Sequence, residues 1–414
     1  MKSRKLLTSV FIFILFIVIF FLKDKFTGPL YQDENHYLPA AVTFSKEPLP
    51  SLNLLKSYNE LNTPIPFILG GWVVRLFGEN IQYLRLLTFG VSFLLLMTFI
   101  WSAPERSKRF FLCLGGLLVF PNYYLCSVYY YTDIFAMATA LAGTVLYIQQ
   151  RHIWSVLFFI ASVACRQYML AFPAAVVAYE LWEFLRKSRN VKQMISQSFN
   201  QRTWMLYVVA VLSIVPWIIL WKGPAPASVM AEQHYDSDKI VHYNFGFVLY
   251  SCTVLAAYYV IPEVLLTRKW GYFLDYPKKY PRLFVSCLLT VIAIVLLFPA
   301  RQAYNPYFTW PYLGYVDQLL MTIGISGFVK QGVFGMLMLI TLMRFISPDL
   351  KFASFVVLFN ILLLGKAQLS WDKYSLPAIM VLWFLAMFDE EWALSSDSVH
   401  KVTNLSFVSQ NKLE

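Results

Sequence analysis

The sequence has little charge and lacks the signatures of several common catalytic sites. Only 14% of its 414 residues are charged, whereas about a quarter is usual in a soluble globular chain. Its five cysteines lie in or beside apolar runs and form no CxxC pair, so neither a disulfide framework nor a metal site is indicated. P-loop, GxGxxG, HExxH and GxSxG patterns are missing. Their absence argues against nucleotide hydrolysis, nicotinamide chemistry and zinc proteolysis.

What the sequence has in abundance is apolar and aromatic residues. Hydrophobic residues make up 58% of the chain and aromatic residues 18%, and apolar runs of membrane-spanning length recur from one end to the other. We therefore predict an all-α polytopic membrane protein, with one transmembrane domain over 1–388 and a short cytoplasmic tail over 389–414. The net charge of +11 comes mostly from Lys and Arg in short loops, which indicates membrane topology and not nucleic-acid binding.

The apolar runs predict about twelve transmembrane helices. The first follows a basic N-terminus without a small-residue cleavage site, so we expect it to be retained as a span. The run over 64–77, opened by Pro64 and Pro66, is too short to cross and predicts a re-entrant or interfacial helix. The predicted spans are 6–22, 81–101, 110–129, 134–149, 153–165, 168–185, 203–221, 243–264, 283–299, 329–346, 350–365 and 375–388.

If 64–77 does not cross, the densest clusters of Lys and Arg share one side with the N-terminus. These clusters lie in 106–109, 186–192 and 268–282. The positive-inside rule then predicts that both termini are cytoplasmic. The first external loop, about 23–80, is long and carries Asp33, Glu34, Glu60 and the re-entrant segment.

Two acids, Asp33 and Glu34, follow closely after the first span. A general base must be a positioned carboxylate or histidine, and we interpret this pair as the candidate base for an acceptor hydroxyl. His36 and Tyr37 lie within one helical turn and are candidates to orient sugar hydroxyls. The alternative is that Asp33 caps a surface helix over 33–46 and that His36 is an ordinary surface histidine.

Further candidates lie at predicted outer ends of later spans. Asp133 follows a tyrosine run, and because a lipid-facing carboxylate is costly we expect it to face a cavity; the alternative is an N-cap for 134–149. Arg166, Arg301 and Lys373 are candidate cations for a lipid-linked phosphate, although Arg166 could instead extend to the interface. Gln167, next to Arg166, is a candidate for sugar or acceptor binding. The aromatic run over 304–315 would suit stacking on sugar rings.

These motifs resemble the GT-C superfamily of membrane glycosyltransferases, which carry an acidic motif in the first external loop. The chain is most similar to the α-1,2-glucosyltransferases that complete the dolichol-linked N-glycan precursor. The matching segments are Gln-Asp-Glu-Asn-His at 32–36, Asn-Thr-Pro-Ile-Pro at 62–66, Tyr-Tyr-Thr-Asp at 130–133, Arg-Gln at 166–167 and Asp-Lys-Tyr-Ser-Leu-Pro at 372–377. The chain departs from the family pattern in three places. The family has His three residues after Glu, whereas His36 here follows Glu34 by two. The family has Thr-Asn after Arg-Gln and Arg-Tyr late in the chain, whereas this chain has Tyr-Met at 168–169 and Lys-Tyr at 373–374.

The resemblance implies transfer of a hexose, of which glucose is one candidate, from a polyprenyl- or dolichyl-phosphate sugar to a lipid-linked oligosaccharide or other glycan. Transfer would occur on the external or lumenal face by direct displacement with inversion, without nucleotide, obligatory metal or other cofactor. Asp33 would be the base, with Glu34 beside it and Asp133 as a supporting acid. Arg166, with Arg301 or Lys373, would face the phosphate. The membrane would be the plasma membrane of a prokaryote or the endoplasmic reticulum of a eukaryote.

Two other classes of function remain open from the sequence. A transporter or flippase for a lipid-linked substrate would share the spans and the external cations. Such a protein should place charges near the membrane midplane within broken spans, whereas the notable charges here lie at predicted span ends. A non-catalytic member of a membrane assembly is the third possibility.

Overall fold

The computed structural model describes residues 2–105, 107–187, 203–232, 243–298, 314–367 and 370–388. Helices are the regular elements of this described part, which contains no strand, as the all-α prediction requires. The chain groups into two compact units whose segments alternate along the sequence. The prediction of a single membrane domain over 1–388 stays a prediction, and the predicted tail over 389–414 lies outside the described residues.

The first unit comprises Met1–Lys108, Tyr123–Glu180 and Phe184–Asp236. In this unit α5 packs against α1 and α8, and α8 packs against α9. The helices wholly or mostly in this unit are α1 (Lys2–Leu22), η1 (Asp24–Phe26), α2 (Glu34–Lys46), α3 (Leu52–Ser57), α4 (Ile65–Phe77), α5 (Ile81–Ser102), α7 (Pro121–Val128), α8 (Thr132–Ile148), α9 (His152–Val163), η2 (Gln167–Leu170), α10 (Ala171–Lys187), α12 (Trp204–Leu212), α13 (Val215–Trp221) and α14 (Ala227–Glu232).

Cations at the start of α1 bind the far end of α5. Arg4 donates to the carbonyl of Ser107 at 3.1 Å, and the Lys5 ammonium donates to the carbonyl of Ala103 at 2.6 Å. Positive side chains suit a helix C-terminus because the last carbonyls are unpaired and the macrodipole is negative there. The two helices are therefore antiparallel neighbours. The connection between them, which carries the acid pair, emerges at the opposite end of α1.

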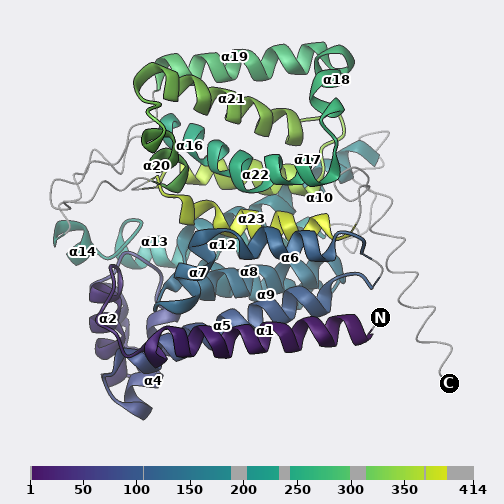
Figure 1. Cartoon of the computed structure of the whole chain (residues 1–414). Coiled ribbons are helices and arrows are strands. Elements are labelled where there is room, and N and C mark those ends of the chain that lie inside the picture. Colours follow the sequence, from purple (N-terminus) through teal and green to yellow (C-terminus); the bar gives the residue numbers. More distant parts are fainter. Residues whose placement is uncertain are drawn as a thin grey trace. The chain divides into compact units, whose positions relative to one another are not determined.

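Two helices of this connection, α2 and α4, lie crosswise to α1 and α5 (Figure 1). They match the helix considered over 33–46 and the short apolar helix expected over 64–77. Two adjacent glycines allow α2 and α4 to approach closely. A Cβ atom on Gly71 would lie 2.8 Å from the carbonyl carbon of Phe44 on α2, and one on Gly70 would lie 3.1 Å from Ala41. The crosswise direction fits a helix that does not span the membrane.

The second unit comprises Arg109–Asn122, Leu181–Glu183 and Ser237–Glu414. Within it α21 packs against α16 and α19, and α23 packs against α6 and α22. Its helices are α6 (Phe110–Leu118), α16 (Phe245–Leu255), η4 (Ala256–Val260), α17 (Ile261–Thr267), α18 (Gly271–Lys279), α19 (Pro281–Leu297), α20 (Tyr315–Thr322), α21 (Gly327–Phe345), α22 (Phe352–Leu364) and α23 (Asp372–Ala386).

Within the described residues, six helical stretches are long and apolar enough to cross a membrane, or eight if the bent pairs α6–α7 and α18–α19 each count as one span. The six are Ser3–Leu22, Ile81–Ser102, Gln167–Arg186, Trp204–Trp221, Phe245–Thr267 and Gly327–Phe345. Each of the twelve predicted spans overlaps a helix, but several of these helices are shorter than a full crossing, including α8, α9 and α22. The protein is an all-helical membrane protein by this criterion, and the count of twelve is not confirmed.

Candidate functional site

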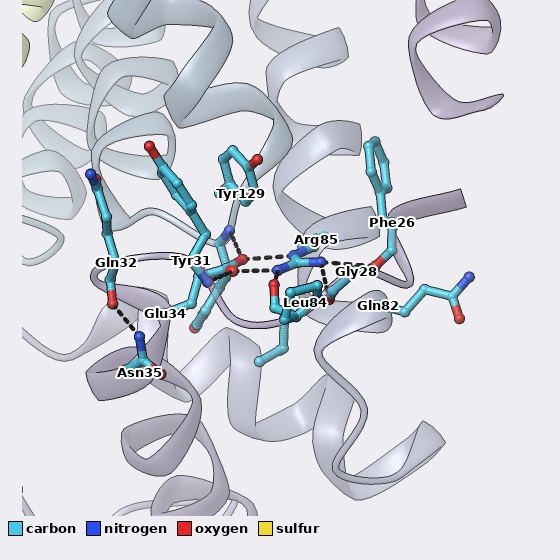
Figure 2. A network of polar contacts seen from close by, with 12 residues as sticks. Phe26, Gly28, Tyr31, Gln32, Glu34, Asn35, Gln82, Leu84, Arg85 and Tyr129 are labelled. Atoms are coloured by element: carbon cyan, nitrogen blue, oxygen red, sulfur yellow. Dashed lines mark hydrogen bonds and ion pairs between the residues drawn. The ribbon is translucent and has the colours of Figure 1, made fainter. Parts of the chain in front are cut away.

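The two adjacent acids of the first loop have different surroundings, and Glu34 is the buried one. Its side chain accepts four hydrogen bonds (Figure 2). Arg85 on α5 donates two of them, from Nε at 2.8 Å and Nη2 at 2.5 Å. The backbone N–H groups of Tyr31 and Tyr130 donate the others, each at 2.8 Å. A carboxylate offers about four lone-pair sites, so these donors occupy the acceptor capacity of Glu34.

Arg85 uses its other N–H groups to hold the chain that leaves α1. They donate to the carbonyls of Phe26, Gly28 and Pro29 at distances between 2.6 and 3.0 Å. The guanidinium carbon also lies 5.3 Å from the centre of the Tyr129 ring. The buried pair therefore joins α1, α2, α5 and the segment before α8. These contacts favour a structural role for Glu34, and its predicted place beside the catalytic base stays a prediction.

A second cluster surrounds the hydroxyl of Tyr37, which is buried one turn into α2. This hydroxyl donates to Asp33 Oδ2 at 3.4 Å and accepts from Arg166 Nη2 at 3.2 Å and from Asn62 Nδ2 at 3.3 Å. Residues four apart share a helix face, which brings Asp33 and Tyr37 together. Asp33 is half-buried and stands at the N-cap position of α2, but its side chain makes no capping hydrogen bond within the described chain.

Arg166 connects this tyrosine to the acid at the start of α8. Its guanidinium is buried, and Nη1 lies 2.8 Å from Asp133 Oδ1 while Nε donates to Thr132 at 2.8 Å. The Tyr168 hydroxyl donates to the same Asp133 oxygen at 3.0 Å. Asp133 is the second residue of α8, and Tyr131 occupies the N-cap position, so the N-cap alternative for Asp133 is wrong. The structure thus unites Asp33, Asp133 and Arg166 from three sequence segments.

Gln167 supports the cluster through the backbone of the loop between α3 and α4. Its amide donates to the carbonyl of Leu61 at 2.6 Å, and the hydroxyl of Thr63 in the same loop donates to the carbonyl of Val163 at 2.8 Å. The loop is therefore held against the segment that leads into Arg166. The contact of the Gln167 amide with the Leu61 carbonyl is a structural role. The predicted role of Gln167 in sugar or acceptor binding stays a prediction.

The same loop carries Glu60, which sequence reasoning did not select. Its side chain is 3% exposed, and its Oε1 has no hydrogen-bond partner among the described residues. Burial raises the pKa of Glu60 to about 8, with the negative charge of Asp33 adding to the rise and the Leu61 backbone N–H and Arg166 opposing it. No motif marks this residue. The available signal is its place just ahead of the short helix that begins near Pro64.

The cluster has more carboxyl groups than cations. Three carboxyls, on Asp33, Glu60 and Asp133, and the guanidinium of Arg166 act electrostatically on the Tyr37 hydroxyl. Asp133 Oδ2 is buried and, like Glu60 Oε1, lacks a hydrogen-bond partner in the described part of the chain. Unpaired buried carboxyl oxygens favour a ligand that supplies hydrogen-bond partners. A polyhydroxyl compound such as a sugar has this character.

The remaining predicted site residues lie on the surface of α2, in the second unit or outside the described residues. His36 is exposed on α2. Lys373 belongs to the second unit, where it is buried with its ammonium 4.0 Å from the centre of the Trp371 ring. Arg301 and most of the aromatic run over 304–315 lie outside the described residues. No group of three or more His, Cys, Asp or Glu side chains suited to a metal occurs among the residues that are described.

Comparisons with protein-family models, with curated proteins and with solved structures found no match. The resemblance to GT-C enzymes therefore stays a prediction from the sequence motifs. What bears on function is the geometry of the cluster around Tyr37.

Proposed function

We propose that the protein is a membrane glycosyltransferase that moves a hexose from a polyprenyl- or dolichyl-phosphate donor to a hydroxyl of a glycan or lipid-linked oligosaccharide. One observation carries the proposal: Asp33, Glu60, Asp133 and Arg166 gather around the buried Tyr37 hydroxyl beside helices that lie crosswise to the spans. This arrangement combines a candidate base with unpaired carboxyl oxygens that could bond sugar hydroxyls. The donor sugar, the acceptor and the α-1,2 linkage are carried by the sequence resemblance.

The chemistry is a direct displacement in which the acceptor hydroxyl attacks the anomeric carbon. The new C–O bond forms as the bond from that carbon to the lipid phosphate breaks, and the phosphate leaves with the electron pair. The hydroxyl proton passes to the carboxylate of Asp33, which is half-buried and adjoins the Tyr37 hydroxyl. A base in this position must lie within hydrogen-bond reach of the proton it takes. Asp133, which is paired with Arg166, acts as the supporting acid.

In this proposal, Arg166 holds the acidic side chains of the cluster in position. Its guanidinium contacts the side chains of Asp133, Thr132 and Tyr37, so its charge is shared with a carboxylate. Such pairing lowers the attraction that a cation can offer to a second anion. The phosphate-side role predicted for Arg166, Arg301 and Lys373 stays a prediction.

The proposal includes twelve spans, cytoplasmic termini and an external or lumenal site. The distribution of Lys and Arg supports this topology. So does the overlap of every predicted span with a helix. The charged residues of the cluster lie at helix ends: Asp33 precedes α2, Asp133 is near the start of α8 and Arg166 precedes η2. Charges at helix ends favour chemistry at the membrane surface over transport through the midplane.

The experiment uses the full-length protein reconstituted in liposomes with radiolabelled polyprenyl-phosphate hexoses and a panel of glycan acceptors. The proposal expects acceptor-dependent consumption of the donor and a glycosylated product on one side of the membrane. A parallel assay follows the leaflet in which the donor lipid resides. Movement of the lipid between leaflets without any transfer would show that the protein is a flippase and would overturn the enzyme proposal.

A further inference from the structure

The mechanism above leaves Glu60 without a role, although it is buried in the same cluster. We propose that Glu60 is a second ligand-binding group of this site, whose carboxylic acid donates a hydrogen bond to a hydroxyl of the acceptor sugar beside the one that Asp33 deprotonates. This inference rests on the proposed function. It assigns a substrate-binding residue that the sequence motifs do not contain.

The loop around Glu60 is held rigidly. The hydroxyl of Tyr58 donates to the carbonyl of Asn62 at 2.6 Å, and the side chain of Asn62 donates to the Tyr37 hydroxyl at 3.3 Å. Gln167 holds the carbonyl of Leu61, directly after Glu60, at 2.6 Å. A side chain on a loop fixed on both sides presents its carboxyl group in one place. Glu60 Oε1 therefore lacks a hydrogen-bond partner among the described residues even though the loop around it is fixed.

An unpaired buried oxygen of this kind is uncommon, because burial removes water and leaves the atom without a replacement. Next to a candidate base, a ligand that completes its bonding is the natural explanation. Glu34, the buried glutamate of α2, by contrast receives donors on both oxygens. Glu60 differs from Glu34 by having no arginine bonded to it in the described residues.

The surroundings of Glu60 favour its neutral form. Burial and the charge of Asp33 raise its pKa to about 8 against the opposing effects of the Leu61 backbone N–H and of Arg166, and Arg166 is already paired with Asp133. Below that pH the carboxyl carries a proton and has an O–H donor. The titratable and charged side chains that face it are Asp33, Tyr37, Tyr58, Tyr130 and Arg166.

Two acids in opposite protonation states suit a sugar acceptor. Asp33 accepts the proton of the attacking hydroxyl, whereas neutral Glu60 donates to a neighbouring hydroxyl oxygen. Pairs of carboxyl groups whose surroundings separate their protonation states commonly divide roles in this way. A ligand that offers a hydroxyl proton and a hydroxyl oxygen close together satisfies both groups.

The test measures kcat/KM for the acceptor against pH in wild type, Glu60→Gln and Glu60→Ala. Glutamine keeps a neutral N–H donor at every pH, and alanine removes it. We expect wild type to lose activity above about pH 8 as the donor ionises and Glu60→Gln to lack this alkaline fall. Below that pH, Glu60→Ala should have lost roughly tenfold or more relative to wild type. Glu60→Gln that keeps the alkaline fall, or that is as impaired as Glu60→Ala, would overturn the inference.

A second readout does not depend on activity. Infrared difference spectra between about pH 6 and about pH 9.5 should show a carboxylic-acid C=O band in wild type that is lost on ionisation and absent in Glu60→Gln. The exposed Glu47 provides the control, because Glu47→Gln should leave this band unchanged. Absence of the band in wild type overturns the inference. Presence of the band without transfer to any acceptor overturns the proposed function instead.

Discussion

At the scale of single residues, Asp33 and Glu34 are neighbours in sequence with separate environments. Consecutive residues at a helix start point to different sides. Glu34 therefore reaches Arg85 while Asp33 lies beside Tyr37. The sequence indicated an acid pair but could not assign a role to each acid, because Arg85 stands 51 positions beyond Glu34 and no local pattern links them.

The pairing of Glu34 with Arg85 predicts a large effect on stability. Removing one partner of a buried ion pair leaves an uncompensated charge and costs about 3–5 kcal/mol. We expect Glu34→Gln and Arg85→Met each to lower the melting temperature in detergent strongly. The double variant should be less destabilised than the sum of the two single variants. A Glu34→Gln protein that melts like wild type but has lost activity would instead support a catalytic role for Glu34.

The raised pKa of Glu60 predicts how stability depends on pH. The pKa rises from its ordinary value of 4.5 to about 8 on folding, so between these values the folded state binds more protons than the unfolded state. Stability should therefore fall as pH rises through this window, by at most several kcal/mol. Thermal unfolding in detergent should show a flatter pH dependence for Glu60→Gln than for wild type. An equal slope in both proteins would contradict the assigned shift.

At the scale of elements, apolar runs predicted the helices well and their breaks less well. The predicted span over 110–129 is two helices, with α7 starting at Pro121. Proline favours the first turn of a helix and disfavours continuation of the preceding one, so this break could be predicted from the sequence.

The contact of Asp133 with Arg166 could not be predicted from the sequence. It depends on how η2 and α8 pack, and periodicity does not specify such tertiary pairing.

The close packing of α2 on α4 predicts a requirement for Gly70 and Gly71. A Cβ atom on Gly70 would lie 2.2 Å from the Tyr130 hydroxyl, and one on Gly71 would lie 2.8 Å from backbone atoms of Phe44. Overpacking of this kind costs about 1–3 kcal/mol, so Gly70→Ala and Gly71→Ala should lower the melting temperature and the activity together.

Gly90 on α5 is the matched control. A Cβ atom there meets nothing within 4 Å, and alanine is favoured over glycine in a helix by about 1 kcal/mol. Gly90→Ala should therefore be neutral or stabilising. If all three alanine variants behave alike, the close approach of α2 and α4 does not exist in the protein.

At the scale of the whole molecule, composition predicted an all-helical protein with membrane-spanning helices, and helix length limits the count of spans. The side of the membrane on which each loop lies stays a prediction from Lys and Arg. In the part of the chain that the structure describes, six to eight helical stretches meet the length and hydropathy criterion. Short helices such as α9 can be spans only if other elements complete the crossing. The distribution of Lys and Arg allowed us to propose which loops lie on the same side of the membrane. It could not group the helices into two compact units, which depends on contacts between distant segments.

The topology predicts which sites an impermeant thiol reagent reaches. The five native cysteines are buried, so they should give little background. In sealed cells, Asn53→Cys on α3 should be labelled from outside, whereas Ser3→Cys near the N-terminus should be labelled only after the membrane is opened. Labelling of both sites from the same side would contradict the external position of the first loop.

The central claim is that Asp33 is the base in a sugar-transfer site. The most direct measurement is the turnover of Asp33→Asn with a polyprenyl-phosphate hexose and a glycan acceptor, compared with wild type and with the control Glu47→Gln. General-base catalysis contributes about 10²–10⁴-fold, so we expect Asp33→Asn to lose at least about a hundredfold in kcat with an unchanged melting temperature. Glu47→Gln should retain full activity. Turnover of Asp33→Asn within about tenfold of wild type would contradict the claim.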